Sequence, residues 1–121
     1  MEIILVNQKI SKEVLKKACE TWFATMVKVV VDIAQNRLAL GGDLHSDAEV
    51  LLLNSGSIQD NLWGANFYPW EPPENRIEYS ALINIRPGQN NRGMEIEDAA
   101  IRDRVKEIIE NLLLGADELL A

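Results

Sequence analysis

Polar residues recur at alternate positions between Ile77 and Arg86, in a segment otherwise typical of a β-strand. Successive side chains of a strand point to opposite faces. Ser80, Asn84 and Arg86 therefore fall on one face, together with Glu78. Serine, asparagine and arginine in register could bind a polar ligand through hydrogen bonds. A solvated surface, or polar groups satisfied inside the protein, would give the same pattern.

A second concentration of polar groups follows this segment, over residues 87–93. It contains several amides, among them Asn91, and it adds Arg92 to the guanidinium group of Arg86. Arginine presents a planar fork that fits a carboxylate or a phosphate, and the start of the next helix would add partial positive charge. We therefore predict that an anion can bind here. In the alternative interpretation, the arginines pair with the three carboxylates of residues 95–98.

The preceding apolar segment contributes two more polar side chains. Asn66 and Tyr68 share one face of a predicted strand, and hairpin pairing would bring them beside Ser80 and Arg86. Gly64 interrupts the same strand, and a glycine there commonly marks a bulge or a close approach of backbone or ligand. The predicted ligand-binding residues are Asn66, Tyr68, Ser80, Asn84, Arg86, Asn91 and Arg92.

His45 is the only histidine, and it stands between two acidic residues, Asp43 and Glu49. An imidazole oriented by a carboxylate can act as a general base, and the three side chains could also bind a hard metal ion. The alternative is a local hydrogen-bonded cap at the start of a helix. No second histidine completes a zinc-ligand spacing, so we expect no tightly bound transition metal. The sequence also has no phosphate-binding glycine loop or dinucleotide fingerprint, and we expect no cofactor.

Hydrophobic periodicity predicts a scaffold of the α+β class for these residues. We expect an antiparallel sheet built from two hairpins and packed with three helices, in the order β-α-ββ-α-ββ-α, as a single domain over residues 1–121. The elements are a strand at 3–6, a helix capped by Ser11, a hairpin at 26–41, a helix with a capping box of Ser46 and Glu49, a hairpin of 62–70 with 76–85, and a helix at 97–114.

The composition restricts the classes of function. The net charge of -7 argues against binding to nucleic acid or to an anionic membrane surface. No stretch reaches the roughly 20 apolar residues of a membrane-spanning helix. A single cysteine excludes an intramolecular disulfide, so we expect a reducing compartment and predict a cytoplasmic location.

The carboxyl-terminal leucines suggest association. Leu114 lies off the apolar stripe of the last predicted helix, and Leu119 and Leu120 follow Gly115, which stops that helix. These side chains must be covered either by a second copy of the chain or by the chain's own sheet. We predict a homodimer.

Parts of the sequence resemble a known family. They are residues 44–49, residues 60–69 with their Trp63-Gly64-Ala65-Asn66 core, the Asn-Ile-Arg-Pro run at 84–87, and Asn91-Arg92. These segments are similar to a small uncharacterised prokaryotic family, a domain of unknown function. The resemblance implies a prokaryotic cytosolic origin and brings no activity, substrate or cofactor with it.

Two functions remain open at this point. The first is a domain that binds a polar small molecule or an anion on the Ser/Asn/Arg face, with His45 as an acid-base group if a reaction is catalysed. The second is an interaction module without catalysis, acting as a homodimer or a partner subunit. Its interface would be the loop of Trp70, Pro72 and Pro73 or the amino-terminal helix.

Overall fold

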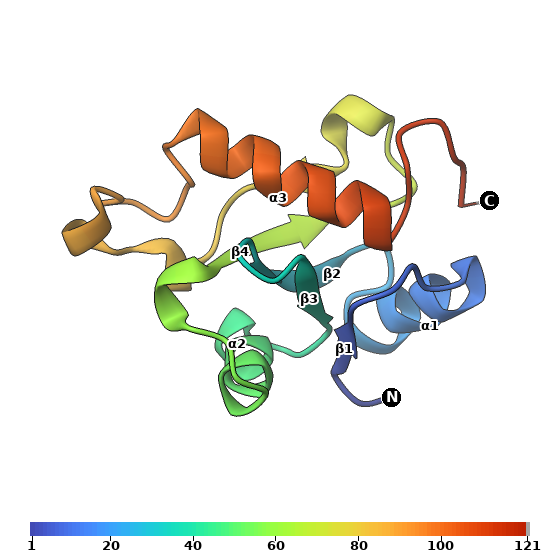
Figure 1. Cartoon of the computed structure of the whole chain (residues 1–121). Helices are drawn as coiled ribbons and strands as arrows, with labels where there is room; N and C mark the ends of the chain where they lie inside the picture. The colour runs from blue at the N-terminus through green and yellow to red at the C-terminus, as the bar shows by residue number, and fades with distance from the viewer. Residues whose placement is uncertain (121) are drawn as a thin grey trace.

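The computed structural model describes residues 1–120, which form an α+β domain with one antiparallel sheet (Figure 1). The sheet has the strand order β1-β3-β2-β4-β5. This confirms the predicted fold class and the predicted element order. In chain order the elements are β1 (Ile4–Val6), α1 (Lys12–Trp22), β2 (Val27–Asp32), β3 (Arg37–Leu40), α2 (His45–Asn54), β4 (Leu62–Phe67), β5 (Ile77–Glu78) and α3 (Ala99–Leu112).

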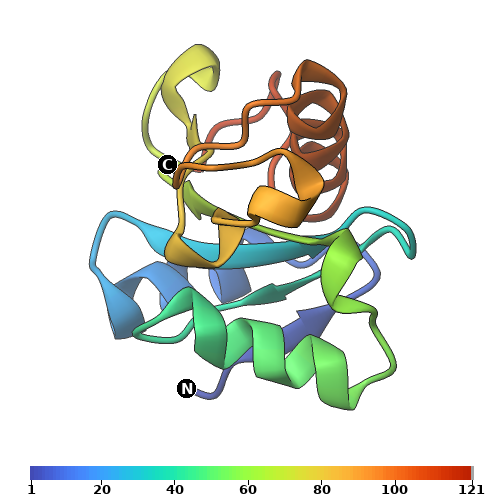
Figure 2. The same ribbon diagram turned by 90° about the vertical axis from the view of Figure 1, so that its left-hand side faces the viewer.

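Helices cover both faces of the sheet, with α3 on one side and α2 on the other (Figure 2). Strand β2 shows why. Val29 packs in the larger core with residues of α1 and α3, whereas Val30 packs in a smaller core with Ala39 and with Leu52 of α2. Alternation in this strand therefore separates two apolar cores. Both faces of this strand are buried, because α2 covers the second face.

The first helix begins as predicted, since the Ser11 side chain accepts a hydrogen bond from the Val14 N–H at 3.2 Å. Its inner face buries Leu15, Ala18 and Cys19 completely. Burial, with a smaller contribution from the charge of Glu20, raises the pKa of the Cys19 thiol to about 12. This thiol is therefore a packing group in the folded protein.

Helix α2 begins two residues earlier than predicted, since its N-cap is Leu44 and not Ser46. Leu44 occupies the N-cap position and has no side-chain acceptor, and the Asp47 carboxylate accepts from the Leu44 N–H at 3.2 Å. The predicted box of Ser46 and Glu49 is therefore wrong, because His45 is already helical. Its imidazole points toward the sheet, where it lies against the Ala65 carbonyl of β4.

The strand predicted over residues 76–85 is mostly absent. Only Ile77 and Glu78 pair with β4, opposite Phe67 and Asn66. The chain then leaves the sheet, and residues 82–84 form a short 3-10 helix. The polar residues after Glu78 consequently do not alternate on one strand face, and this correction removes the main reason for grouping Ser80, Asn84 and Arg86.

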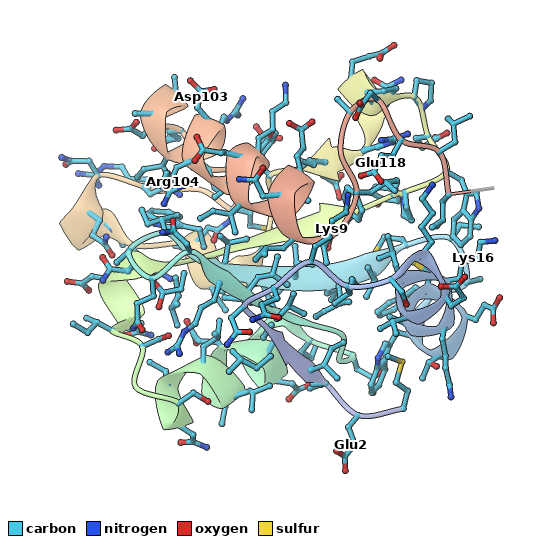
Figure 3. All side chains as sticks on the ribbon, turned by 45° about the vertical axis from the view of Figure 1, so that its right-hand side comes forward. Glu2, Lys9, Lys16, Asp103, Arg104 and Glu118 are labelled. Atoms are coloured by element: carbon cyan, nitrogen blue, oxygen red, sulfur yellow. The ribbon has the colours of Figure 1, made fainter. Side chains whose placement is uncertain are left out.

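The carboxyl-terminal tail folds back on its own domain. Of the three leucines Leu114, Leu119 and Leu120, the first and the last are buried against the chain itself, and Leu119 is exposed. Arg76 holds the tail by donating to the carbonyl oxygens of Gly115 at 3.0 Å and Glu118 at 2.8 Å. Figure 3 shows the Lys9 side chain beside Glu118, with which it forms an ion pair. Two of the three leucines behind the homodimer prediction are thus covered without a partner.

No helix within residues 1–120 has the length and apolar character needed to cross a membrane.

Candidate functional site

A cavity of about 430 Å³ opens between the amino-terminal end of α2, the β2-β4-β5 part of the sheet and the segment after β5. Its wall is mostly apolar, with a few polar side chains at the sheet. The lining residues are Lys28, Leu44, His45, Ser46, Asn66, Glu78, Ser80, Ala81, Leu82, Ile83 and Met94. Three predicted site residues, His45, Asn66 and Ser80, therefore meet in one place.

Three polar residues form a row across neighbouring strands at the floor of this cavity. Asn66 of β4 is paired with Lys28 of β2 on one side and with Glu78 of β5 on the other. The Asn66 Nδ2 donates to Glu78 Oε1 at 2.7 Å, and the Tyr68 hydroxyl approaches the same oxygen at 3.4 Å. Cross-strand pairing thus fixes the order of a cation, an amide and a carboxylate.

The buried His45 ring has a defined tautomer. Its Nε2 lies 2.9 Å from the carbonyl oxygen of Ala65. A carbonyl oxygen only accepts, so Nε2 carries the hydrogen and Nδ1 of the neutral ring carries the lone pair. Burial lowers the pKa of His45, and the Lys28 charge lowers it further, while the Ala65 carbonyl, Asn66 and Glu78 raise it. The net lowering keeps the ring neutral at neutral pH.

The Asn66 side chain has one buried atom without a partner. A carboxylate only accepts hydrogen bonds, so the bond to Glu78 fixes Nδ2 on that side and turns Oδ1 away from it. Among residues 1–120 no donor meets this oxygen, although it is inaccessible to solvent. Because an unsatisfied buried acceptor costs about 1–3 kcal/mol, its presence calls for a reason. Asn66 is also the residue that links His45 to Glu78.

Apolar side chains form the opposite wall and rim of the cavity. Leu82 is 68% exposed, and Leu44 and Met94 are exposed beside it. Ala81 lies against the sheet because β4 has a glycine at position 64: a Cβ there would stand 2.6 Å from the Ala81 Cβ and 3.2 Å from His45 Cδ2. The absence of a side chain at Gly64 therefore permits the predicted close approach to β4, and the group that approaches is the Ala81 side chain.

The carboxylates predicted to orient His45 do not do so in residues 1–120. Asp43 is exposed, and the nearest ionic partner of Glu49 is Arg86, at 3.8 Å. The acceptor that orients the imidazole is the Ala65 carbonyl instead. The structure therefore places a histidine at the cavity without assembling the predicted His45, Asp43 and Glu49 group.

Arg86 is committed to protein groups. Its Nε donates to the Ile83 carbonyl at 3.1 Å, and its Nη2 donates to the Leu62 carbonyl. The guanidinium also stacks on Trp63, 4.7 Å from the ring centroid. Arg86 and Glu49 line a second, more polar hollow of about 540 Å³, which adjoins the first cavity and shares Leu82 and Ile83 with it. The hydrogen bonds of Arg86 hold the segment after β5 against Leu62, the first residue of β4.

The remaining predicted residues have structural contacts. Buried Asn84 replaces the missing strand pairing by accepting from the Gly64 N–H at 2.8 Å and donating to the Gly64 carbonyl at 2.9 Å. Buried Asn91 donates to three carbonyl oxygens and accepts from the Glu97 N–H at 2.9 Å. Arg92 is exposed on the loop. Asn84, Asn91 and Arg86 thus fit the alternative in which the polar groups of this region are hydrogen-bonded inside the protein.

Sequence reasoning missed eight of the eleven residues that line the cavity, four of which are instructive. Lys28 and Glu78 could have been found from strand register, because both flank Asn66. Ser46 was interpreted as a helix cap, and Met94 lies in a loop with no periodic pattern. Within residues 1–120 no three His, Cys, Asp or Glu side chains lie close enough to hold a metal ion.

The fold and the cavity define a small α+β domain with one histidine-containing hollow beside its second helix. Residues 4–112 match the family described as Protein of unknown function (DUF5674), and the chain belongs to this family. The resemblance to a domain of unknown function is thereby confirmed. No curated protein and no solved structure matches the chain significantly.

Proposed function

We propose that this domain binds a small organic molecule in the cavity beside α2. The observation that carries the proposal is the wall itself: exposed leucine and methionine side chains face a polar floor in which His45, Asn66 and Glu78 have fixed orientations. Ligand cavities of soluble proteins have this character, with mostly apolar walls and a few placed polar groups, over volumes of about 300–1,000 Å³.

The cavity replaces the Ser/Asn/Arg strand face as the proposed site. Asn66 and Ser80 remain in it, whereas Asn84, Arg86 and Asn91 hold the loops that surround it. Their structural contacts support the proposal indirectly, because they fix the irregular segment that carries the apolar wall. A rigid wall lowers the entropy cost of binding.

The proposal is tested by screening a fragment library against ¹⁵N-labelled protein and following backbone amide shifts. Ligands should move the amides of Ser46, Asn66 and Ala81 together. Shifts spread over the surface, or confined to the second hollow at Arg86, would contradict the proposal.

A matched pair of variants makes the test specific. Leu44→Asp places a charge on a side chain that lines this cavity and not the hollow at Arg86. It should weaken fragment binding about tenfold, since a buried leucine contact is worth about 1.5–3 kcal/mol. Leu119→Asp alters another exposed leucine, 71% against 58% exposed, that does not line the cavity. It should leave fragment affinity unchanged, and equal losses in both variants would count against a site at the cavity.

We propose a homodimer as the second candidate function, on the basis of α2. This helix packs Ala48 and Leu52 against the sheet. Val50 on its outer side is nevertheless 52% exposed, and Leu53, near the carboxyl-terminal end of the helix, and Ile58, just after it, are also exposed. A helix with one covered face usually carries polar residues on the other. A second copy of the chain would cover these side chains.

A further inference from the structure

We infer that the ligand of this cavity is an organic amine, an apolar molecule that carries an ammonium group. The inference rests on the proposed function and names the chemistry of its ligand. The structural basis is a set of hydrogen-bond acceptors at the polar end of the cavity, one of which is the carboxylate of Glu78, a side chain with no salt-bridge partner among residues 1–120.

Two acceptors at this end have no donor among residues 1–120. The first is Nδ1 of His45, because the one N–H of the neutral ring, on Nε2, points to the Ala65 carbonyl. The second is Glu78 Oε2, because both Asn66 and Tyr68 donate to Oε1. An ammonium group has only donors and matches such a set, whereas a carboxylate ligand would add two more acceptors.

The charges favour the same head group. The cavity wall contains one anion, Glu78, and one cation, Lys28. The Lys28 ammonium lies over the Phe23 ring, 5.2 Å from its centroid, so it has a partner that is not part of the cavity wall. His45 is neutral, since burial lowers its pKa. The protein as a whole carries a charge of -7, which attracts cationic molecules and repels anionic ones.

The geometry also assigns a positioning role to Asn66. It holds Glu78 through Nδ2 and lies beside the His45 ring, whose pKa its side chain raises. We expect a carboxylate oxygen and an imidazole nitrogen to receive the ammonium N–H donors. Asn66 holds the carboxylate, and the Ala65 carbonyl orients the imidazole. The apolar wall of Leu82 and Met94 would hold the body of the molecule.

The experiment compares four probes that share a phenyl ring and differ in the head group: phenethylamine, hydrocinnamamide, hydrocinnamate and ethylbenzene. Each is titrated into the full chain at about pH 7.5, where the amine is charged, and amide shifts at the cavity give the dissociation constant. We expect phenethylamine to bind at least about tenfold more tightly than hydrocinnamate, because the Glu78 carboxylate accepts a charge-assisted hydrogen bond from an ammonium group and repels a carboxylate.

Glu78→Gln tests the carboxylate. It should remove the preference for phenethylamine and leave the affinity for ethylbenzene unchanged. Glu74→Gln is the matched control, because Glu74 is exposed and does not line the cavity. If Glu78→Gln is unstable, the order of the four probes on the unaltered chain still decides the question.

The outcomes separate the two proposals. Equal or tighter binding of hydrocinnamate at the cavity amides would overturn the amine inference and leave the cavity as a binding site. A preference for the amine that persists in Glu78→Gln would also overturn it. If none of the probes, ethylbenzene included, shifts the cavity amides at millimolar concentration, both the amine inference and the proposed function are wrong.

Discussion

The neutral state of His45 makes stability depend on pH at the scale of a single residue. Burial lowers its pKa below the ordinary value of 6.5, against the opposing effects of the Ala65 carbonyl, Asn66 and Glu78. The unfolded chain therefore binds the proton more readily than the folded chain. The resulting stability is fully present above about pH 6.5 and is lost as the pH falls through the lower, folded pKa.

We predict that the imidazole of this sole histidine titrates below its ordinary value in an NMR experiment. We also predict that the thermal midpoint of the native chain falls between about pH 7 and about pH 5. His45→Asn should flatten that fall, because the variant has no group that must charge in this range. An unshifted or raised titration would contradict the burial of the ring.

Gly64 determines a second prediction at the residue scale. Gly64→Ala should destabilise the fold by about 1–3 kcal/mol, since the new methyl would overlap Ala81 and crowd His45. The measurement is urea unfolding. Adding Ala81→Gly should recover part of the loss, because it removes the closest atom. Gly88→Ala is the control, with no atom within 4 Å of the added group, and it should change stability by less than about 0.5 kcal/mol.

The segment after β5 illustrates how one arginine can hold an element without regular structure. Arg86 joins this segment to the first residue of β4 through the carbonyls of Ile83 and Leu62. We predict that Arg86→Ala lowers the free energy of unfolding by about 2–4 kcal/mol, because it leaves buried carbonyls unpaired. Arg86→Lys should not restore it, since an ammonium cannot reproduce the planar fork.

Arg92→Ala provides the comparison for this prediction. Its side chain is exposed, and its loss should change stability by less than about 0.5 kcal/mol in the same urea experiment. If Arg86→Ala were as mild as Arg92→Ala, the arginine would be a solvated group, free to bind an anion as the sequence suggested.

Elements whose partners are local could be predicted from the sequence. The β2-β3 hairpin and helix α1 follow from period-two and period-3.6 patterns, and Ser11 caps the helix as expected. The segment after β5 could not be predicted, although its composition resembles a strand. Its backbone partner is replaced by the Asn84 side chain, a long-range contact that leaves no periodic signal.

At the scale of the whole molecule, the candidate site was predicted only in part. His45, Asn66 and Ser80 were predicted as site residues, with His45 as an acid-base group for a ligand on the Ser/Asn/Arg face, but no sequence pattern placed the three side chains in one cavity. They meet because α2 lies across the sheet and Gly64 lets the chain approach β4 closely. Polar residues used for structure and polar residues facing a cavity look alike in a sequence, and only the contacts of Arg86 and Asn84 distinguish them.

Association is the prediction that belongs to the whole molecule. The monomer has a mass of 13.6 kDa, and we expect light scattering at micromolar concentration to give twice that value. Val50→Lys should shift the mass toward the monomer, because it places a charge on the exposed face of α2. Leu119→Lys should not, since it alters the tail. A monomer mass for the unaltered chain would contradict the homodimer.

The burial of Cys19 determines when its thiol can react with oxidants and disulfide reagents. A thiolate is the species that reacts with disulfide reagents and oxidants, and here the thiol is enclosed and its pKa is about 12. We predict that labelling by a chromogenic disulfide reagent occurs only from opened molecules, so its rate in low urea should rise with the same dependence as global unfolding. A urea-independent rate would instead reveal local opening of α1. If labelling requires global unfolding, oxidation found at Cys19 shows that those molecules had previously been unfolded.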